Sequence, residues 1–101
     1  MHIEINYANI EPSDALEAHL HEKLHRALGR FEDHLTRIEA YLADENSPTK
    51  DGGMDKRCTL EARPKGKDPI AVEAHADDFF AAVDAAVGKL ERALTHRLER
   101  D

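Results

Sequence analysis

The sequence has little that would support disulfides, cysteine-rich metal sites or membrane insertion. It contains a single cysteine, Cys58, so neither an intramolecular disulfide nor a cysteine-rich zinc site can form. No apolar run approaches the ~20 residues that span a bilayer. The N-terminal segment MHIEINY also lacks the charged and apolar regions of a signal peptide. These absences predict a cytoplasmic protein with no membrane partner.

Aromatic residues and positive charge are also scarce. Aromatic side chains make up 5% of the residues, which leaves little material for stacking on unpaired bases. Acidic residues outnumber basic ones, and the formal net charge is −7. An evenly spread negative charge would repel the phosphates of a nucleic acid. Whether the protein can bind nucleic acid therefore depends on how its cations are distributed.

The hydrophobic pattern predicts six elements in a single domain, residues 1–101, because a chain of this length builds one core. Apolar and polar residues alternate, as in half-buried strands, over residues 2–7, 36–43, 57–63 and 70–76. Apolar residues recur every three or four positions, as in amphipathic helices, over residues 14–28 and over the last quarter of the chain. The predicted order is β-α-β-β-β-α.

This order indicates an α+β two-layer sandwich. Only about one face of each element is apolar, so both helices should cover one side of a four-stranded sheet. The first two strands are joined through a helix, which favours parallel pairing, and the later strands should pair antiparallel. Residues 44–55 are rich in Asn, Ser, Pro and Gly and are predicted to form a long loop between strands.

Both predicted helices carry signals for their ends and their buried sides. Ser13 follows Pro12 and suits the N-cap of the first helix, and Gly29 is a candidate C-cap. Asp77 and Asp78 precede the second helix, where the helix dipole favours carboxylates. The apolar column expected to pack this helix against the sheet contains Phe80, Val83, Val87, Leu90, Leu94 and Leu98.

The strand alternation also assigns a place to the excess acid. One glutamate from each strand is expected to project from the sheet face that the helices leave open: Glu4, Glu39, Glu61 and Glu73. The opposite phase places Cys58 inward with Leu60, which predicts a buried structural thiol rather than a nucleophile. Much of the negative charge is therefore expected on the side of the sheet away from the helices.

Each predicted helix has a column of cations at helical spacing. On the first helix the column contains His19, Lys23, Arg26 and Arg30, and on the second it contains Lys89, Arg92, His96 and Arg100. Cations one helical turn apart, about 5.4 Å, can follow a phosphodiester backbone. Lys56 and Arg57 add two more at the start of the third strand. The competing interpretation is a solvated face with ion pairs inside each helix, such as Glu22–Arg26.

The first helix also contains the string HEKLH, residues 21–25, which matches the H-E-x-x-H pattern of zinc peptidases. Histidines four residues apart lie on one helical face and could share a zinc ion. The further ligands of a metzincin are missing, because Phe31 stands where the third histidine is required. Two solvated histidines are the favoured interpretation, with adventitious metal binding and a zinc-dependent hydrolase as alternatives.

The last helix carries the segment that makes a family resemblance specific. An aromatic residue is followed by Ala-Ala, a β-branched residue and Asp, and then by Lys-Leu and a basic helix end: Phe80, Ala81, Ala82, Val83, Asp84, Lys89, Leu90 and Arg92. With the preceding order of elements, the chain resembles the ribosome-hibernation family of hibernation-promoting factors and ribosome-associated translation inhibitors, also called sigma-54 modulation proteins. The resemblance extends over essentially the whole chain.

The resemblance implies a fold and a function. It implies the β-α-β-β-β-α fold and binding in the decoding channel of the small ribosomal subunit, where such a protein overlaps messenger and transfer RNA and stops translation reversibly. It implies no catalysis, cofactor, metal or small-molecule substrate. By position, it assigns RNA-facing roles to Lys23, Arg26, Lys89, Arg92 and Arg97.

The leading prediction is a ribosome-binding factor that contacts small-subunit ribosomal RNA through the basic faces of its helices. The predicted RNA-binding residues are His19, Lys23, Arg26, Arg30, Lys56, Arg57, Lys89, Arg92, His96, Arg97 and Arg100. The net charge and the acidic sheet face motivate an alternative, a protein-interaction module of the same fold that has lost RNA binding.

Overall fold

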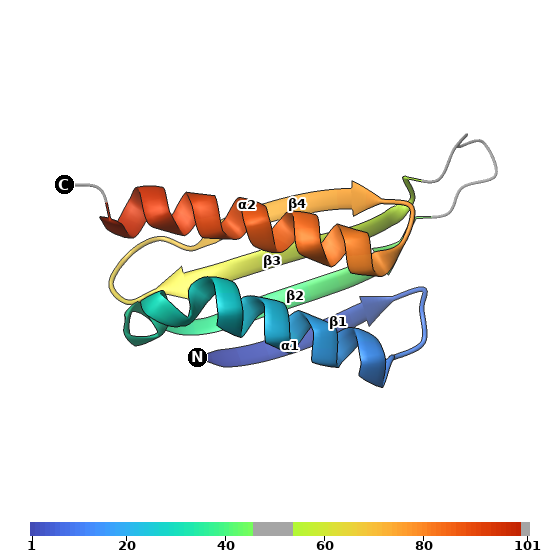
Figure 1. Cartoon of the computed structure of the whole chain (residues 1–101), viewed down its shortest axis with the longest axis horizontal. Coiled ribbons are helices and arrows are strands. Elements are labelled where there is room, and N and C mark those ends of the chain that lie inside the picture. Colours follow the sequence, from blue (N-terminus) through green and yellow to red (C-terminus); the bar gives the residue numbers. More distant parts are fainter. Residues whose placement is uncertain (46–53, 100–101) are drawn as a thin grey trace.

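The structure, a computed structural model, describes residues 1–45 and 54–99. Its elements are β1 His2–Ala8, α1 Asp14–Leu28, the 3₁₀ helix η1 Gly29–His34, β2 Leu35–Asp44, β3 Lys56–Pro64, β4 Ile70–Ala76 and α2 Phe79–Glu99. The predicted order β-α-β-β-β-α is confirmed (Figure 1). The first three strands extend their predicted ranges by one residue at one or both ends, and η1 adds to the predicted elements. Residues 46–53 of the predicted long loop lie outside the described residues.

The strands form one mixed sheet in the order β1-β2-β3-β4. β1 and β2 are parallel, with Ile5 opposite Ala40. The two later pairings are antiparallel, and Leu60 of β3 lies opposite Ala40 on one side and Val72 on the other. The parallel pair is the one joined through a helix, as predicted, because the helix carries the chain back to the starting end of the sheet.

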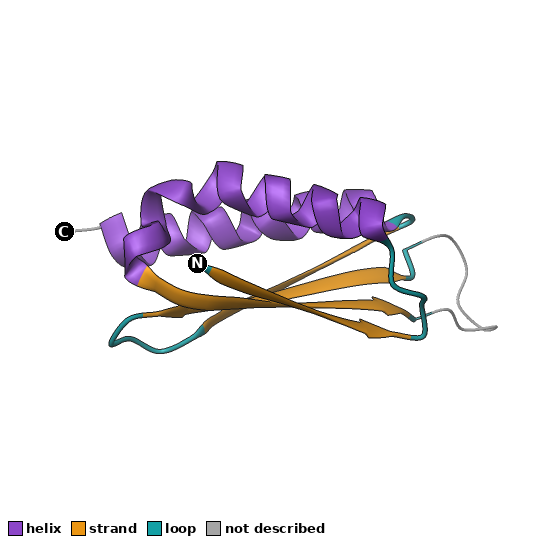
Figure 2. Cartoon of the chain, turned by 90° about the horizontal axis from the view of Figure 1, so that it is seen from below, coloured by secondary structure: helices purple, strands orange, loops and turns teal. Residues whose placement is uncertain are grey.

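Both helices lie on one side of the sheet, which confirms the two-layer α+β prediction (Figure 2). α1 buries Leu20 and Leu24 completely, and α2 buries Leu90 and Leu94 completely. Each such leucine contributes about 1.5–3 kcal/mol through the apolar area that it removes from water. α2 packs on β3 and β4, and α1 lies beside it over β1 and β2 (Figure 1). Within the described part of the chain, neither helix is long and apolar enough to cross a membrane.

The predicted caps are present at the start of both helices. The Ser13 hydroxyl accepts a hydrogen bond from the Leu16 amide at 3.1 Å, and the Asp78 carboxylate accepts one from the Ala81 amide at 2.8 Å. Each satisfies an amide that has no partner inside its helix. Gly29 follows α1 as predicted, but its φ of −56° is right-handed. The chain needs no left-handed turn there because it continues directly into η1.

The predicted glutamates lie on strand positions that face away from the helices, and arginines lie between them. Arg37 is 2.6 Å from Glu4 and 3.3 Å from Glu39. Arg63 is 3.1 Å from Glu61 and 3.8 Å from Glu39. This face is therefore an ion-pair network rather than an unbalanced acidic surface, since arginine positions neighbour the glutamates across the strands.

Candidate nucleic-acid interface

The cations of the first helix lie on the side of α1 that faces α2. His19 is hydrogen-bonded to Asp84 of α2, with 2.7 Å between Nε2 and Oδ1. The Lys23 ammonium is 4.0 Å from the same carboxylate. The side chains of His19 and Lys23 are both partly buried between the helices. Asp84 therefore offsets the charge that this part of the column would present to an RNA.

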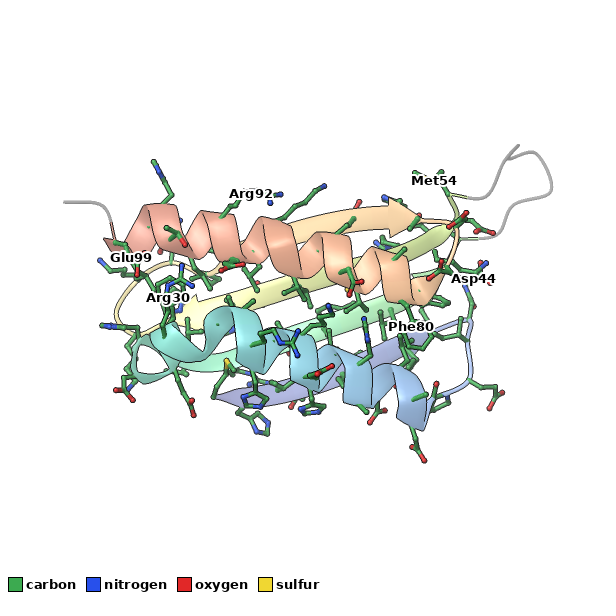
Figure 3. The ribbon with its side chains drawn as sticks, in the orientation of Figure 1. Arg30, Asp44, Met54, Phe80, Arg92 and Glu99 are labelled. Carbon is green, nitrogen blue, oxygen red and sulfur yellow. The ribbon has the colours of Figure 1, made fainter. Side chains whose placement is uncertain are left out.

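Arg30 continues the column from η1 and is bound by the C-terminal half of α2. Its guanidinium donates to the carboxylates of Glu91 at 3.1 Å and Glu99 at 3.2 Å, and to the Thr95 hydroxyl at 2.7 Å. It also stacks on the ring of Phe31 at 4.3 Å. The hydrogen bonds to Glu91 and Glu99 raise the pKa of Arg30 above its ordinary value. Figure 3 shows Arg30 and Glu99 together between the two helices.

The fourth member of this column, Arg26, pairs within its own helix. Its guanidinium is 3.1 Å from the Glu22 carboxylate, at the i, i+4 spacing. Both side chains are exposed, and such pairs contribute only about 0.3–0.5 kcal/mol. This ion pair is the one that the competing interpretation of the column predicts. The α1 column is thus paired with carboxylates along its whole length.

The cations of α2 have a different environment. The Lys89 ammonium donates to the Glu73 carbonyl of β4 at 2.7 Å, and Arg97 donates to the Asp68 carbonyl at 3.2 Å. Carbonyls hold these side chains in place without cancelling their charge. Arg92 and His96 are exposed and form no ion pair within the described residues. Figure 3 shows Arg92 on the side of α2 away from α1.

The remaining predicted contacts divide between the other end of the molecule and the chain terminus. The Lys56 ammonium lies 3.1 Å from Asp55 and 3.4 Å from Asp44, and these hydrogen bonds raise its pKa. Arg57 lies 3.3 Å from Glu45 and occupies a β3 position that faces away from the helices. Arg100 lies outside the described residues.

The two helices therefore share one side of the sheet, as expected, but their cationic columns do not join into one surface. The α1 column faces α2 and is paired with carboxylates, whereas the α2 column faces away from α1. The carboxylates of Asp84, Glu91 and Glu99 lie between the two columns. The cations whose charge no neighbouring carboxylate offsets are concentrated on the outer side of α2.

Phe80 departs from its predicted place in the apolar column of α2. Its side chain is 44% exposed, and it lines a cavity of about 340 Å³ with Ile10, Leu16, Phe79 and other residues. The neighbouring Phe79 is partly buried against the core instead. Phe80 lies about 100° around the helix from Phe79, on the flank of α2 that faces α1, where its ring meets His19 edge-on with 5.0 Å between the ring centroids.

Comparison with known proteins shows which family the chain belongs to. A family model described as "Sigma 54 modulation protein / S30EA ribosomal protein" matches residues 3–101. The chain belongs to this family. The resemblance seen in the last helix is therefore confirmed over nearly the whole chain.

Solved structures of two similar proteins share the fold of this S30EA family member. A ribosomal subunit interface protein from Coxiella burnetii superposes with a TM-score of 0.81 at 24% identity, covering 99% of this chain and 100% of that one. The N-terminal domain of Protein Y from Thermus thermophilus gives 0.76 at 26% identity, covering 96% and 99%. A search of curated proteins finds no match.

Within the S30EA fold, the HEKLH string occupies an exposed flank of α1. His21 and His25 stack on one another, with 6.3 Å between ring centroids, and Glu22 is paired with Arg26. Leu24 is completely buried. No group of three or more potential metal ligands occurs among the described residues. This environment favours the interpretation of two solvated histidines.

Two cations of this family member were not among the predicted contacts. Lys65 and Lys67 lie in the turn between β3 and β4, and both are exposed. The sequence signal for them is weak because they belong to no periodic column. The cations of the turn PKGKDP could be identified as neighbours of α2 only after the turn was placed beside Arg97.

Proposed function

We propose that this chain is a hibernation factor that binds the small ribosomal subunit in the cytoplasm and reversibly inhibits translation. The observation that carries the proposal is the match of residues 3–101 to a family of ribosomal proteins. The similarity to the Protein Y domain over 96% of this chain supports it. The protein acts by occupying a site on the ribosome, so the proposal involves no catalysis, cofactor, metal or small-molecule substrate.

We further propose that small-subunit ribosomal RNA is contacted mainly through the outer side of α2. Lys89, Arg92, His96 and Arg97 are exposed and unpaired with carboxylates in the described part of the chain. Lysines and arginines at this spacing can follow successive phosphates. The predicted contacts on α1 make a smaller electrostatic contribution, because the carboxylates of Glu22, Asp84, Glu91 and Glu99 offset their charge.

Cosedimentation with purified small subunits over a salt series tests this proposal. Binding is expected at low salt, with the logarithm of the association constant falling linearly with the logarithm of salt concentration. The double substitution Lys89→Glu and Arg92→Glu is expected to abolish binding at salt concentrations where the unmodified protein binds. Lys23→Glu with Arg26→Glu is expected to weaken binding less.

A matched control distinguishes the effect of the net charge of the protein from the effect of where the cations lie. Replacing Arg37 and Arg63 with Glu makes the same change in net charge on the opposite side of the sheet, and binding is expected to be retained. Absence of binding by the unmodified protein at low salt would contradict the proposal. Equal losses for the α2 and sheet-face variants would show that net charge, rather than the α2 surface, governs association.

One observation favours the alternative of a protein-interaction module. Most of the predicted cations are paired with carboxylates, including all four of the α1 column and both at the start of β3. A capture experiment with nuclease treatment distinguishes the two functions. Partners that survive the nuclease and include no ribosomal component would support the module. Recovery of small-subunit proteins only without nuclease would support the RNA contact.

A further inference from the structure

The turn between β3 and β4 lies at the same end of the molecule as the C-terminus of α2 (Figure 1). Its backbone is fixed on two sides. The Lys65 amide donates to the His34 carbonyl of η1 at 2.8 Å, and the Asp68 carbonyl accepts from Arg97 of α2 at 3.2 Å. Gly66, with a φ of +69°, adopts a left-handed conformation that suits glycine. The turn is thus held between the end of η1 and the C-terminal part of α2.

This anchoring uses the backbone of the turn and leaves its two lysine side chains in solvent. Residues 65–69 are all exposed. Lys65 and Lys67 flank Gly66, and the Lys67 amide closes the turn on the Pro64 carbonyl at 3.3 Å. The two ammonium groups are therefore carried by a fixed loop, and a ligand that bound them would not have to order the backbone first.

These two lysines differ from most other cations of the described chain because they form no ion pair. The described lysines and arginines that form no ion pair are Lys65, Lys67, Lys89, Arg92 and Arg97. All five belong to α2 or to the turn that α2 contacts through Arg97. Every other lysine and arginine in the described ranges lies within 4.0 Å of a carboxylate. The lysines and arginines without an ion pair thus lie on α2 and on the turn that Arg97 contacts, and together they are defined here as the α2–turn surface.

We infer that the α2–turn surface is a single binding site for the phosphate backbone of RNA, in which Lys65 and Lys67 contact phosphates beyond those reached by α2. The inference rests on the proposed function and extends it to a turn that the family resemblance did not implicate. Lysine suits this role because its ammonium is a mobile point charge with three donors. Such contacts add affinity without reading base sequence.

The hydrophobic residues of the molecule argue against a lipid partner for this surface. The exposed large hydrophobic residues of the described chain are Tyr41, Met54 and Phe80. Figure 3 shows Met54 and Phe80 at the end opposite Arg30 and Glu99, and Tyr41 occupies a strand position in phase with Glu39, facing away from the helices. A membrane-binding surface combines cations with apolar side chains that enter the bilayer. The α2–turn surface has the charge alone, as a phosphate-backbone contact requires.

The test replaces both turn lysines with glutamine and measures binding to purified small subunits and to protein-free small-subunit ribosomal RNA over a salt series. Two lost phosphate contacts should reduce the magnitude of the salt slope by about 1.8, taking about 0.9 per contact. If the plots of log association constant against log salt concentration for the variant and the unmodified protein meet at 1 M salt, the variant binds about sixtyfold more weakly at 0.1 M. Heat denaturation should be unchanged, because neither side chain has a partner within the described residues.

Arg37→Gln with Arg63→Gln is the matched control, since it removes two cations from the sheet face, and its salt slope should equal that of the unmodified protein. An unchanged slope for the Lys65 and Lys67 variant, with normal binding by the unmodified protein, would overturn the inference and leave the proposed function standing. Loss of binding to subunits but not to protein-free RNA would also overturn it, because the partner would then be a ribosomal protein. If the unmodified protein bound neither probe, the proposed function itself would fail.

A second measurement uses the unmodified protein and does not depend on the variants. Reductive methylation followed by peptide mass analysis reports how accessible each lysine is. Lys65, Lys67 and Lys89 are expected to be protected when the RNA is added, while Lys56, at the other end, stays reactive. Reactivity of both turn lysines that is unchanged at saturating RNA would contradict the inference.

Discussion

At the scale of single residues, Cys58 shows how the interior of the sandwich excludes water from a buried side chain. Its side chain has no exposed surface, and burial raises the pKa of the thiol from 9.0 to about 12. The cause is desolvation, which disfavours the thiolate. The sequence prediction of a buried thiol is confirmed, and the thiol has the low reactivity expected of a structural cysteine.

This shift predicts a pH dependence of stability. Between about pH 9 and pH 12 the unfolded chain loses the Cys58 proton while the folded chain keeps it. The unfolded state therefore binds fewer protons, and the free energy of unfolding falls as the pH rises, by up to about 1.4 kcal/mol per pH unit. Urea denaturation measures this effect by comparing the unmodified protein with Cys58→Ala. Above pH 9 the free energy of unfolding of the unmodified protein should fall more steeply with pH than that of the variant. Other titrating groups are common to both proteins, so a constant difference would contradict the prediction.

At the scale of elements, α2 combines a buried side with a cationic side. Leu90 is completely buried against the sheet, and Arg92, two residues further on, is exposed. Helical geometry places these two positions about 200° apart. The same helix can therefore stabilise the fold with one side and bind a partner with the other.

Paired substitutions should separate these two roles. Leu90→Ala is expected to lower the free energy of unfolding by about 2–5 kcal/mol, because it removes buried methyl groups and leaves a cavity. Arg92→Ala is expected to change it by less than about 0.5 kcal/mol, as is usual for exposed positions. Urea denaturation gives the stabilities and cosedimentation gives the binding. A large stability loss for Arg92→Ala would show that its side chain is not free on the surface.

At the scale of the whole molecule, an acidic protein presents an uncompensated basic surface. The net charge is −7, yet the described cations without ion pairs gather on the α2–turn surface. The carboxylates on the rest of the molecule give the protein its negative net charge. Local potential, rather than net charge, determines attraction to a polyanion at short range, because salt screens charges more than about 10 Å apart.

This separation of charge predicts that the protein binds both a positively charged and a negatively charged chromatographic medium. At pH 7 and low salt the protein should bind an anion exchanger through its net charge and heparin through the α2–turn surface. Lys89→Glu with Arg92→Glu should abolish retention on heparin and strengthen retention on the exchanger. Arg37→Glu with Arg63→Glu carries the same net charge and should still bind heparin. Failure of the unmodified protein to bind heparin would contradict a locally basic surface.

Local sequence signals determined the order of elements and most of their ends. Alternation of period two identified all four strands, and Ser13 and Asp78 marked the starts of both helices. The apolar column that contains Leu90 and Leu94 identified the buried side of α2, because a helix repeats with a fixed period. The family resemblance was likewise recognised from a contiguous segment of α2, and the family model then matched residues 3–101.

Tertiary structure decided which cations remain available. His19 meets Asp84 and Arg30 meets Glu91 and Glu99 across sequence separations of 61 to 69 residues, and no local pattern encodes such pairs. The same packing exposed Phe80 and brought Lys65 and Lys67 next to α2. A periodic pattern shows which residues share a side of one element. Only the packing of elements against one another shows what that side meets, and therefore which charges are offset and which remain for a partner.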